Sequence, residues 1–258
     1  MDLKIIPTDL LPAFLQYVPK NLASAFKTLK DAAISTGNFS FYASVSSVYS
    51  SKIEGENIEL DSYIKYKKFG IEFLPDYTKK TDDLYNAYTF AKNNLLGQQN
   101  IISAHKLLTK NILTASKQGA LGTQNMYVTN SEGNIEYVAI SPDELKSVME
   151  NYYMDISTLI NEKFTVNEVF FYASMLHLIF VKIHPFNDGN GRSARLIEKW
   201  FVAQKLGENA WFIESEKYYY TELNNYYKNI RMLGIEYQDL DYTKALPFLL
   251  MLSKSVTN

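Results

Sequence analysis

Residues 165–195, TVNEVFFYASMLHLIFVKIHPFNDGNGRSAR, predict two consecutive helices joined by a glycine-containing loop. Thr165-x-x-Glu168 is the pattern of a capping box, and the run Val169–Val181 that follows is apolar nearly all round, which is typical of a central buried helix. A second helix is expected to begin within Asn190–Gly191 and to end at Gly207. Its apolar residues recur on one face: Leu196, Ile197, Trp200 and Phe201.

One segment departs from the helical pattern and predicts a β-hairpin. Met126–Thr129 and Ile135–Val138 favour strands, and turn-forming residues, Asn130–Gly133, lie between them. Another helix is expected after the hairpin, because Ser141-Pro142-Asp143-Glu144 supplies a cap, a first-turn proline and a glutamate that can return to the cap. The expected fold class is therefore mainly α, a helical bundle that carries one β-hairpin.

The composition excludes several classes of protein. The 258 residues include 26 Lys and Arg, 28 Asp and Glu, and no cysteine. The near-balance of charge argues against a broad nucleic-acid-binding surface, and the lack of cysteine excludes disulfides and thiolate nucleophiles. The first residues lack the layout of a signal peptide, and the longest apolar run is shorter than the roughly 20 residues of a membrane span. We therefore expect a cytoplasmic protein that binds neither nucleic acid nor membranes.

The loop between the two central helices combines the features of an anion-binding site. Gly189-Asn190-Gly191 at a helix start allows backbone N–H groups to converge on one point, and the helix dipole adds to the attraction for phosphate. Arg192 and Arg195 are three residues apart, so both can project from one helical face towards that anion. Two guanidinium groups suit a chain of phosphates, because each presents a planar fork of donors.

Two further side chains of the loop supply a metal ligand and a base. Asp188 is a hard oxygen ligand placed to hold Mg²⁺ against phosphate oxygens, and His184 can take a proton near neutral pH. Each feature also has a simple structural explanation: a packed histidine, a helix cap, a tight turn and solvated charges. Their joint occurrence within 12 residues favours phosphoryl or nucleotidyl transfer.

The segment His184-Pro185-Phe186-x-Asp188-Gly189-Asn190-Gly191-Arg192-x-x-Arg195 resembles the complete signature of the Fic family. The resemblance implies a helical core with a β-hairpin flap, Mg-ATP as donor, and a Ser, Thr or Tyr hydroxyl of a protein as acceptor. It implies that His184 deprotonates this hydroxyl for attack on the α-phosphate, while Asp188 holds Mg²⁺. Arg195 is then expected to meet the γ-phosphate, and the other phosphate oxygens are expected to meet Gly189, Asn190, Gly191 and Arg192.

An upstream segment, Ser50-Ser51-Lys52-Ile53-Glu54-Gly55, resembles a second and less specific motif of the same family. Residues 42–55 can form a helix that ends at Gly55, which places Glu54 where a carboxylate opposes the helix dipole by roughly 0.3–1 kcal/mol. The resemblance implies that Glu54 pairs with Arg195 and blocks productive placement of the γ-phosphate. The alternative is a surface glutamate beside a helix-ending glycine; the downstream motif favours the inhibitory role.

The resemblance also divides the chain and assigns the hairpin. An N-terminal helical region that contains the inhibitory helix is expected over residues 1–80, and a catalytic core with the C-terminal helices over 81–258. The flap, about 119–142, is expected to hold a target segment by strand pairing. The flap residues that we expect to contribute are Tyr127, Val128, Tyr137 and Val138. The usual flap arginine and one of its two closing prolines are missing, which puts the choice of target in doubt.

A tyrosine-rich stretch, Lys217–Leu223, resembles the Tyr-Tyr-x-x-Leu sequence that lines the adenine pocket in relatives. Tyr220 and Leu223, three apart on a helix, could flank a base by stacking and apolar contact. Ordinary packing of an aromatic helix is the alternative. His105 and His177 lie within apolar helical stretches, and we interpret both as structural.

The leading hypothesis is a protein adenylyltransferase restrained by Glu54, with ATP and a hydroxyl-bearing protein, such as the chain itself, as partners. Removal of AMP from a modified protein uses the same residues, with Glu54 positioning a water. Transfer of a different nucleotide also remains open. A non-catalytic ATP-sensing protein is the alternative from another class, and His184 argues against it because a sensor needs no base. Homo-oligomer formation is left open.

Overall fold

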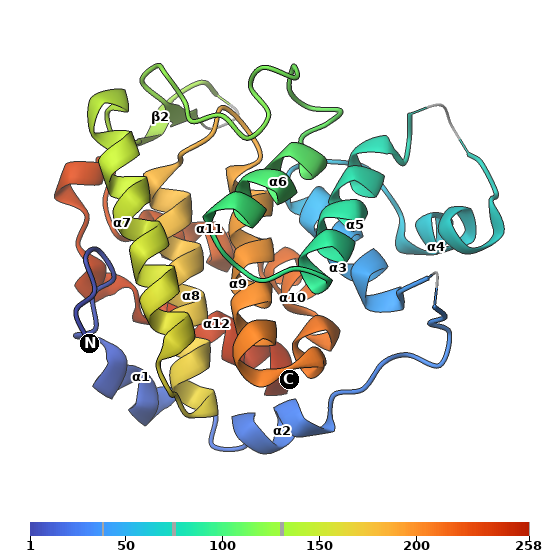
Figure 1. The fold of residues 1–258 in the computed structure, drawn as a ribbon, viewed down its shortest axis with the longest axis horizontal. Helices are drawn as coiled ribbons and strands as arrows, with labels where there is room; N and C mark the ends of the chain where they lie inside the picture. The colour runs from blue at the N-terminus through green and yellow to red at the C-terminus, as the bar shows by residue number, and fades with distance from the viewer. Residues whose placement is uncertain (38, 74–75, 130–131, 258) are drawn as a thin grey trace.

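The computed structural model describes residues 1–37, 39–73, 76–129 and 132–257, and it is mainly helical with one small two-stranded sheet (Figure 1). The longer elements are α3 (Phe41–Ile53), α4 (Leu60–Phe69), α5 (Lys79–Lys92), α6 (Gln98–Leu108), β1 (Tyr127–Thr129), β2 (Ile135–Val138), α7 (Pro142–Asn161), α8 (Val166–Ile183), α9 (Asn190–Leu206), α11 (Leu223–Arg231) and α12 (Leu246–Thr257). The short helices are α1 (Leu11–Tyr17), α2 (Leu22–Thr28), η1 (Glu208–Phe212), α10 (Ser215–Thr221), η2 (Tyr237–Asp239) and η3 (Tyr242–Lys244). The predicted fold class is confirmed.

Helices α8 and α9 lie side by side in the middle of the molecule (Figure 1). The predicted capping box is present: the Thr165 amide donates to Glu168 Oε2 over 2.7 Å, and the Glu168 amide donates to Thr165 Oγ1 over 3.3 Å. By length and composition α8 could cross a membrane, but 78% of it is buried inside the protein. Such burial is typical of the core helix of a globular fold.

The hydrophobic core surrounds α8. It is one cluster of buried side chains, whose members come from many segments between Ile6 and Leu252. Phe14 of α1 and Phe26 of α2 pack edge-on against Phe171 and Phe170 of α8, with ring centroids 5.5 and 5.9 Å apart. Burying an aromatic side chain of this size stabilises a fold by about 1.5–3 kcal/mol. The N-terminal helices are therefore part of the core, and the proposed division at residue 80 remains a prediction.

Helix α3 is fixed to α9 at two levels, one helical turn apart. Ser50 faces Arg195, and Ser46 accepts a hydrogen bond from Lys199 Nζ over 2.6 Å. Lys199 is buried and also pairs with the buried Glu216 over 2.6 Å. Burial alone would raise the pKa of the Glu216 carboxyl, but Lys199 outweighs it and holds that pKa below its usual value. Helix α3 is thus held by buried polar contacts.

The predicted hairpin is confirmed. Strands β1 and β2 are antiparallel with Val128 opposite Tyr137, and Figure 1 shows them near the upper ends of α7 and α8. The Tyr137 hydroxyl donates to the Lys182 carbonyl over 2.6 Å, which anchors β2 to the end of α8. The turn residues Asn130 and Ser131 of the predicted hairpin lie outside the described residues.

Helix α7 begins at Pro142 as expected, but the predicted cap differs. The Ser141 hydroxyl accepts no backbone hydrogen bond and instead donates to Glu144 Oε2 over 3.1 Å. Serine and glutamate therefore satisfy each other, and the first-turn proline, which has no N–H group, needs no cap of its own.

Candidate active site

His184 ends α8 in a left-handed backbone conformation, with a φ of 54°. For a residue other than glycine this conformation costs about 1–2 kcal/mol, so the surrounding structure must impose it. The bend directs the imidazole into a pocket of about 480 Å³. Burial lowers the pKa of His184 below its ordinary value, against the opposing effects of the Val181 backbone and the Glu54 carboxylate. The imidazole is therefore neutral at pH 7, as a general base must be.

The loop after His184 is held by a buried phenylalanine and an asparagine. Phe186 is fully buried, and Asn190 binds both of its backbone polar groups: Oδ1 accepts from the Phe186 amide over 2.9 Å, and Nδ2 donates to the Phe186 carbonyl over 2.7 Å. The Asn190 side chain therefore supports the loop, which leaves its backbone N–H group as its means of binding an anion.

His105 of α6 joins the loop to the start of the flap. Its ring stacks on Phe186 with centroids 3.7 Å apart, its Nδ1 accepts from the Gly119 amide over 2.8 Å, and its Nε2 lies 2.9 Å from the Asp188 carbonyl. Because a backbone amide can only donate, Nδ1 is bare and Nε2 carries the proton. Burial lowers the pKa of His105 to about 4. This histidine is structural, as predicted.

The two glycines lie at the start of α9, as expected. Gly189 has a φ of 78°, and the first hydrogen bond of the helix runs from the Ser193 amide to its carbonyl over 2.9 Å. The N–H groups of residues 190–192 consequently have no partner within the helix. At Gly191, a Cβ atom would lie 2.5 Å from Glu54 Oε1. The Glu54 carboxylate thus lies over the N-terminus of α9, where an anion is favoured.

Arg195 is buried and clamped by α3. Its Nε donates to Ser50 Oγ over 2.8 Å, one terminal nitrogen donates to Glu54 Oε1 over 2.6 Å, and the other donates to the Tyr226 hydroxyl over 3.3 Å. Glu54 immediately follows the last residue of α3, and Gly55, with a φ of 85°, ends the helix as predicted. Burial would raise the pKa of Glu54, but Arg195 and Arg192 lower it, so the carboxylate is ionised.

Arg192 is also buried but has weaker partners. Its terminal nitrogens lie 3.8 Å from Glu56 and 3.9 Å from Asp188, and its Nε makes no hydrogen bond to any residue that the structure describes. A buried guanidinium with an unused donor is costly unless a ligand completes it. A phosphate group would supply the acceptor oxygens that this arginine lacks.

Asp188 can supply one carboxylate to a metal ion, and a bound phosphate ligand would have to supply further oxygens. Its side chain is 53% exposed, and Oδ1 accepts from the Gly189 amide over 2.5 Å. Within the described ranges, no group of three or more His, Asp or Glu could hold a metal alone. Protein-bound Mg²⁺ commonly uses one or two carboxylates with water and phosphate oxygens, and Asp188 fits that mode.

The pocket wall opposite the loop comes from α11. It consists of Tyr226, Tyr227, Ile230 and Arg231, whereas Tyr220 and Leu223 are outside the lining. The expectation that Tyr220 and Leu223 share a helix is wrong, because α10 ends at Thr221 and α11 begins at Leu223. Tyr220 instead packs against Tyr49, with ring centroids 5.7 Å apart. The Tyr-Tyr-x-x-apolar spacing recurs at Tyr226–Ile230, and this repeat was the signal for the residues that sequence reasoning missed.

The hairpin closes the third side of the pocket. Of the four predicted flap residues, Val128 and Tyr137 line it, together with Thr129 and Glu136. Tyr127 is exposed, and Val138 donates its amide to the Ile235 carbonyl over 2.8 Å. Of the predicted loop residues, His184, Gly191 and Arg195 form part of the lining, whereas Gly189, Asp188 and Arg192 do not.

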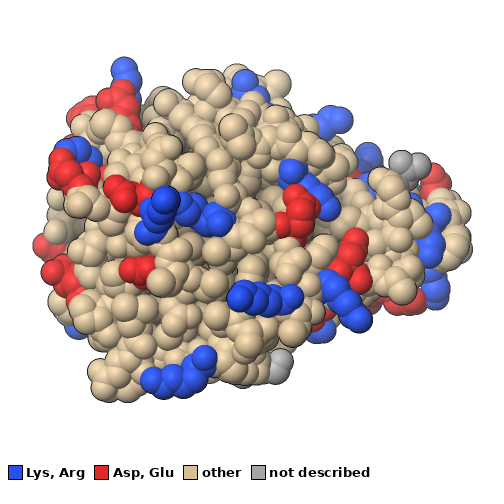
Figure 2. Space-filling model, turned by 60° about the horizontal axis from the view of Figure 1, so that its bottom comes forward, with Lys and Arg blue, Asp and Glu red and all other residues tan. Residues whose placement is uncertain are grey.

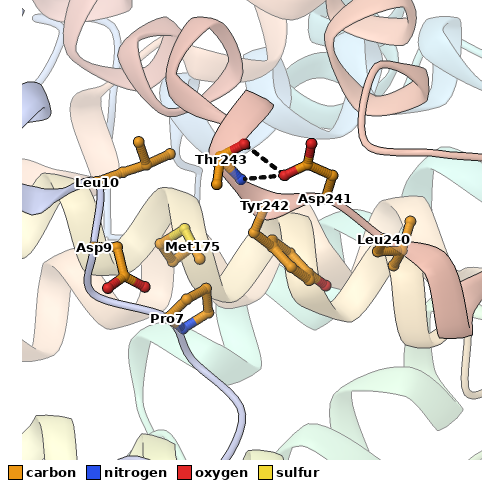
Figure 3. A pocket seen from close by; sticks show the side chains of 8 residues that line it. All are labelled: Pro7, Asp9, Leu10, Met175, Leu240, Asp241, Tyr242 and Thr243. Carbon is orange, nitrogen blue, oxygen red and sulfur yellow. Dashed lines mark hydrogen bonds between the residues drawn. The ribbon is translucent and has the colours of Figure 1, made fainter.

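A second pocket and the charged surface offer fewer groups that could bind or react with a ligand than the pocket that contains His184. A smaller pocket of about 230 Å³ lies between the N-terminal segment and the 240–243 segment (Figure 3). Of its two carboxylates, Asp241 is already bonded to Thr243. On the face in Figure 2, acidic and basic side chains are interspersed, and no continuous basic surface is visible among the described residues of that face.

A neutral imidazole beside an anion cradle and two buried arginines indicates a site for transfer of a phosphate-containing group. Residues 95–202 match the model of the Fic/DOC family. Proteins of this family generally transfer AMP or other nucleotidyl groups to proteins and commonly use Mg-ATP. A search of curated proteins gave no match.

Solved structures share the fold. A Fic family protein from Desulfovibrio desulfuricans G20 has a TM-score of 0.76 at 16% identity, over 100% of this chain and 76% of that one. A Fic domain containing signaling protein from Bacteroides thetaiotaomicron VPI-5482 has a TM-score of 0.64 at 18% identity, over 97% and 93%. Fic-1 from C. elegans has a TM-score of 0.66 at 17% identity, over 96% and 71%.

Proposed function

We propose that the protein transfers AMP from Mg-ATP to a Ser, Thr or Tyr hydroxyl of a protein, and that Glu54 inhibits this reaction. The observation that carries the proposal is the position of the Glu54 carboxylate. It lies over the N-terminus of α9 and on Arg195, next to the pocket that contains His184. An anionic group of the chain itself therefore occupies the place that suits a phosphate.

Each loop residue has one role in the proposed reaction. His184 accepts the proton of the acceptor hydroxyl, whose oxygen forms a bond to the α-phosphorus while the bond to the pyrophosphate breaks. The α9 amides and Arg192 stabilise the charge on the phosphate oxygens. Asp188 would hold Mg²⁺, which neutralises charge on the leaving pyrophosphate when it is bound.

Inhibition follows from competition for Arg195. The N–H group of Arg195 that donates to Glu54 can serve a terminal phosphate oxygen instead, while other donors of the guanidinium bind Ser50 and Tyr226. Withdrawal of Glu54 would free a buried cation and clear the space over Gly191. The adenine is proposed to lie against Tyr227 and Ile230 of α11.

The test compares the parent protein with Glu54→Gly, and Glu54→Gly with and without His184→Ala. With ATP labelled at the α-phosphate, Glu54→Gly is expected to label protein about 5- to 150-fold faster than the parent, the range of a coupling of 1–3 kcal/mol. ATP labelled at the γ-phosphate should give no labelled protein, and the His184→Ala double variant should lose the α-label. Transfer of the γ-label, or unchanged labelling without the imidazole, would contradict the proposal.

A second candidate, removal of AMP from a modified protein, is favoured by one observation. Glu54 is ionised and close enough to His184 to raise its pKa, so it could orient a water for attack on the phosphorus. AMP-modified protein, prepared with Glu54→Gly, would be incubated with the parent. Release of AMP by the parent and not by Glu54→Gly would support this activity.

A further inference from the structure

We propose that Tyr226, held by His177 and Glu198, is a positioning residue for Arg195 that keeps the guanidinium in place after Glu54 withdraws. The proposal rests on the proposed function, in which Arg195 meets the terminal phosphate of ATP. It adds a second support for that arginine, built from α8, α9 and α11 and independent of α3.

A continuous chain of buried hydrogen bonds connects these residues. Arg195 donates to the Tyr226 hydroxyl over 3.3 Å, this hydroxyl lies 2.9 Å from His177 Nε2, and His177 Nδ1 lies 2.8 Å from Glu198 Oε2. Tyr219 closes the chain by donating to Glu198 Oε1 over 2.8 Å. All five side chains are essentially inaccessible to solvent.

One tautomer of His177 satisfies every hydrogen bond in this chain. In the tautomer with the proton on Nδ1, His177 donates to Glu198 Oε2, and its Nε2 is an acceptor. Tyr226 must then donate its proton to Nε2, which directs a lone pair of its oxygen towards Arg195. Among the described residues, the Tyr226 hydroxyl has only these two partners. His177 therefore makes Tyr226 an acceptor for the guanidinium.

The two supports of Arg195 differ in what happens when the pocket opens. Three of its hydrogen bonds go to Ser50 on α3 and to Glu54 directly after α3, and these are at risk when α3 moves. The bond to Tyr226 comes from α11, whose tyrosine stacks on Tyr219 with ring centroids 5.0 Å apart. The contribution of Tyr226 should thus be largest in the protein whose Glu54 has been removed.

The experiment measures the binding of Mg-ATP and Mg-ADP by calorimetry in the Glu54→Gly background, with and without Tyr226→Phe. If Arg195 binds the terminal phosphate, Glu54→Gly prefers ATP to ADP. Tyr226→Phe is expected to reduce this preference about three- to tenfold, the effect of one ordinary hydrogen bond, and to leave ADP affinity within about twofold. A general loss of structure would instead weaken the binding of Mg-ATP and of Mg-ADP by a similar factor.

Two further variants make the result specific. Tyr219→Phe is the matched control, because it removes an equally buried hydroxyl from Glu198 without touching Arg195, and it should keep the preference for ATP. His177→Gln should reduce the preference and replaces Tyr226→Phe if that variant does not fold. An unchanged preference in both Tyr226→Phe and His177→Gln overturns the inference. Absence of any preference in Glu54→Gly itself overturns the assignment of Arg195 to the terminal phosphate.

Discussion

Glu54 Oε1 lies 2.5 Å from the point that a Cβ atom of residue 191 would occupy. The Glu54 carboxylate and the second glycine of the loop therefore share one space. A β-carbon at this position would need the carboxylate to shift, because real Cβ atoms do not approach oxygen so closely. This contact links α3 to the start of α9 without any assumption about ligands.

Gly191→Ala is predicted to destabilise the protein through this contact. Forcing a methyl group into a packed site typically costs about 1–3 kcal/mol, here by pushing Glu54 away from Arg195. In the Glu54→Gly background the same substitution should cost little and could be favourable, because alanine suits a helix better than glycine. Urea unfolding of the four proteins gives the coupling energy. Additive effects would show that the two residues do not share this space.

Glu54→Gly is predicted to be less stable than the parent without nucleotide but to gain more from Mg-ATP. Loss of the carboxylate leaves Arg195 short of an acceptor, which typically costs about 1–3 kcal/mol. A ligand present at 100 times its Kd stabilises by about 2.7 kcal/mol, and Glu54→Gly should show this gain as a larger rise in Tm. Glu54→Gln, which keeps the volume over Gly191, should respond less. Equal shifts in all three proteins would argue against competition for the site.

We predict that the free energy of unfolding falls in acid, because His105 takes up a proton more readily in the unfolded protein. Its pKa is about 4 in the folded protein and about 6.5 when unfolded, so between these values the unfolded state binds more protons. Stability should be complete above pH 6.5 and fall by roughly 3 kcal/mol as the pH drops to 4. His105→Gln cannot titrate there, so its unfolding free energy should fall less over this range. Parallel pH profiles for the two proteins would contradict the assignment.

Lys199→Met is predicted to be strongly destabilising, because it leaves the buried Glu216 without its cation. Breaking a buried pair costs about 3–5 kcal/mol, whereas replacing both partners is often close to neutral. Lys199→Met with Glu216→Leu should therefore recover much of the loss, as measured by chemical unfolding. Lys205→Met is a control on the same helix, since the hydrogen bonds of Lys205 to the described residues go to backbone carbonyls near the surface. Equal losses for both single variants would show that burial of the pair is unimportant.

Local signals explain why much of the fold was predictable. The capping box at Thr165, the glycines at 55 and 207 and the apolar run of α8 act over a few residues, so helix ends could be placed from sequence. The His184–Arg195 loop was predictable for the same reason, since its cradle depends on residues that are adjacent in the chain.

Contacts between distant segments were not predictable in this way. His105 and Asp188 are 83 residues apart, and no local pattern marks a histidine that bonds to a loop carbonyl. The expectation that Tyr220 and Leu223 share a helix was wrong for a similar reason. Two Tyr-Tyr-x-x-apolar repeats follow one another, and the break between α10 and α11 at Glu222 decides which of them faces the pocket.

The placement of His184 at the end of the most deeply buried helix limits how the site can adapt. The imidazole is attached to the end of α8, which the hydrophobic core surrounds. The core also imposes the left-handed backbone conformation of His184. Small misalignments of an incoming hydroxyl cannot be corrected by moving the base. Alignment must therefore come from the bound substrate and from the β1–β2 hairpin beside the pocket. The precision of any reaction here would depend on how firmly the substrate is held.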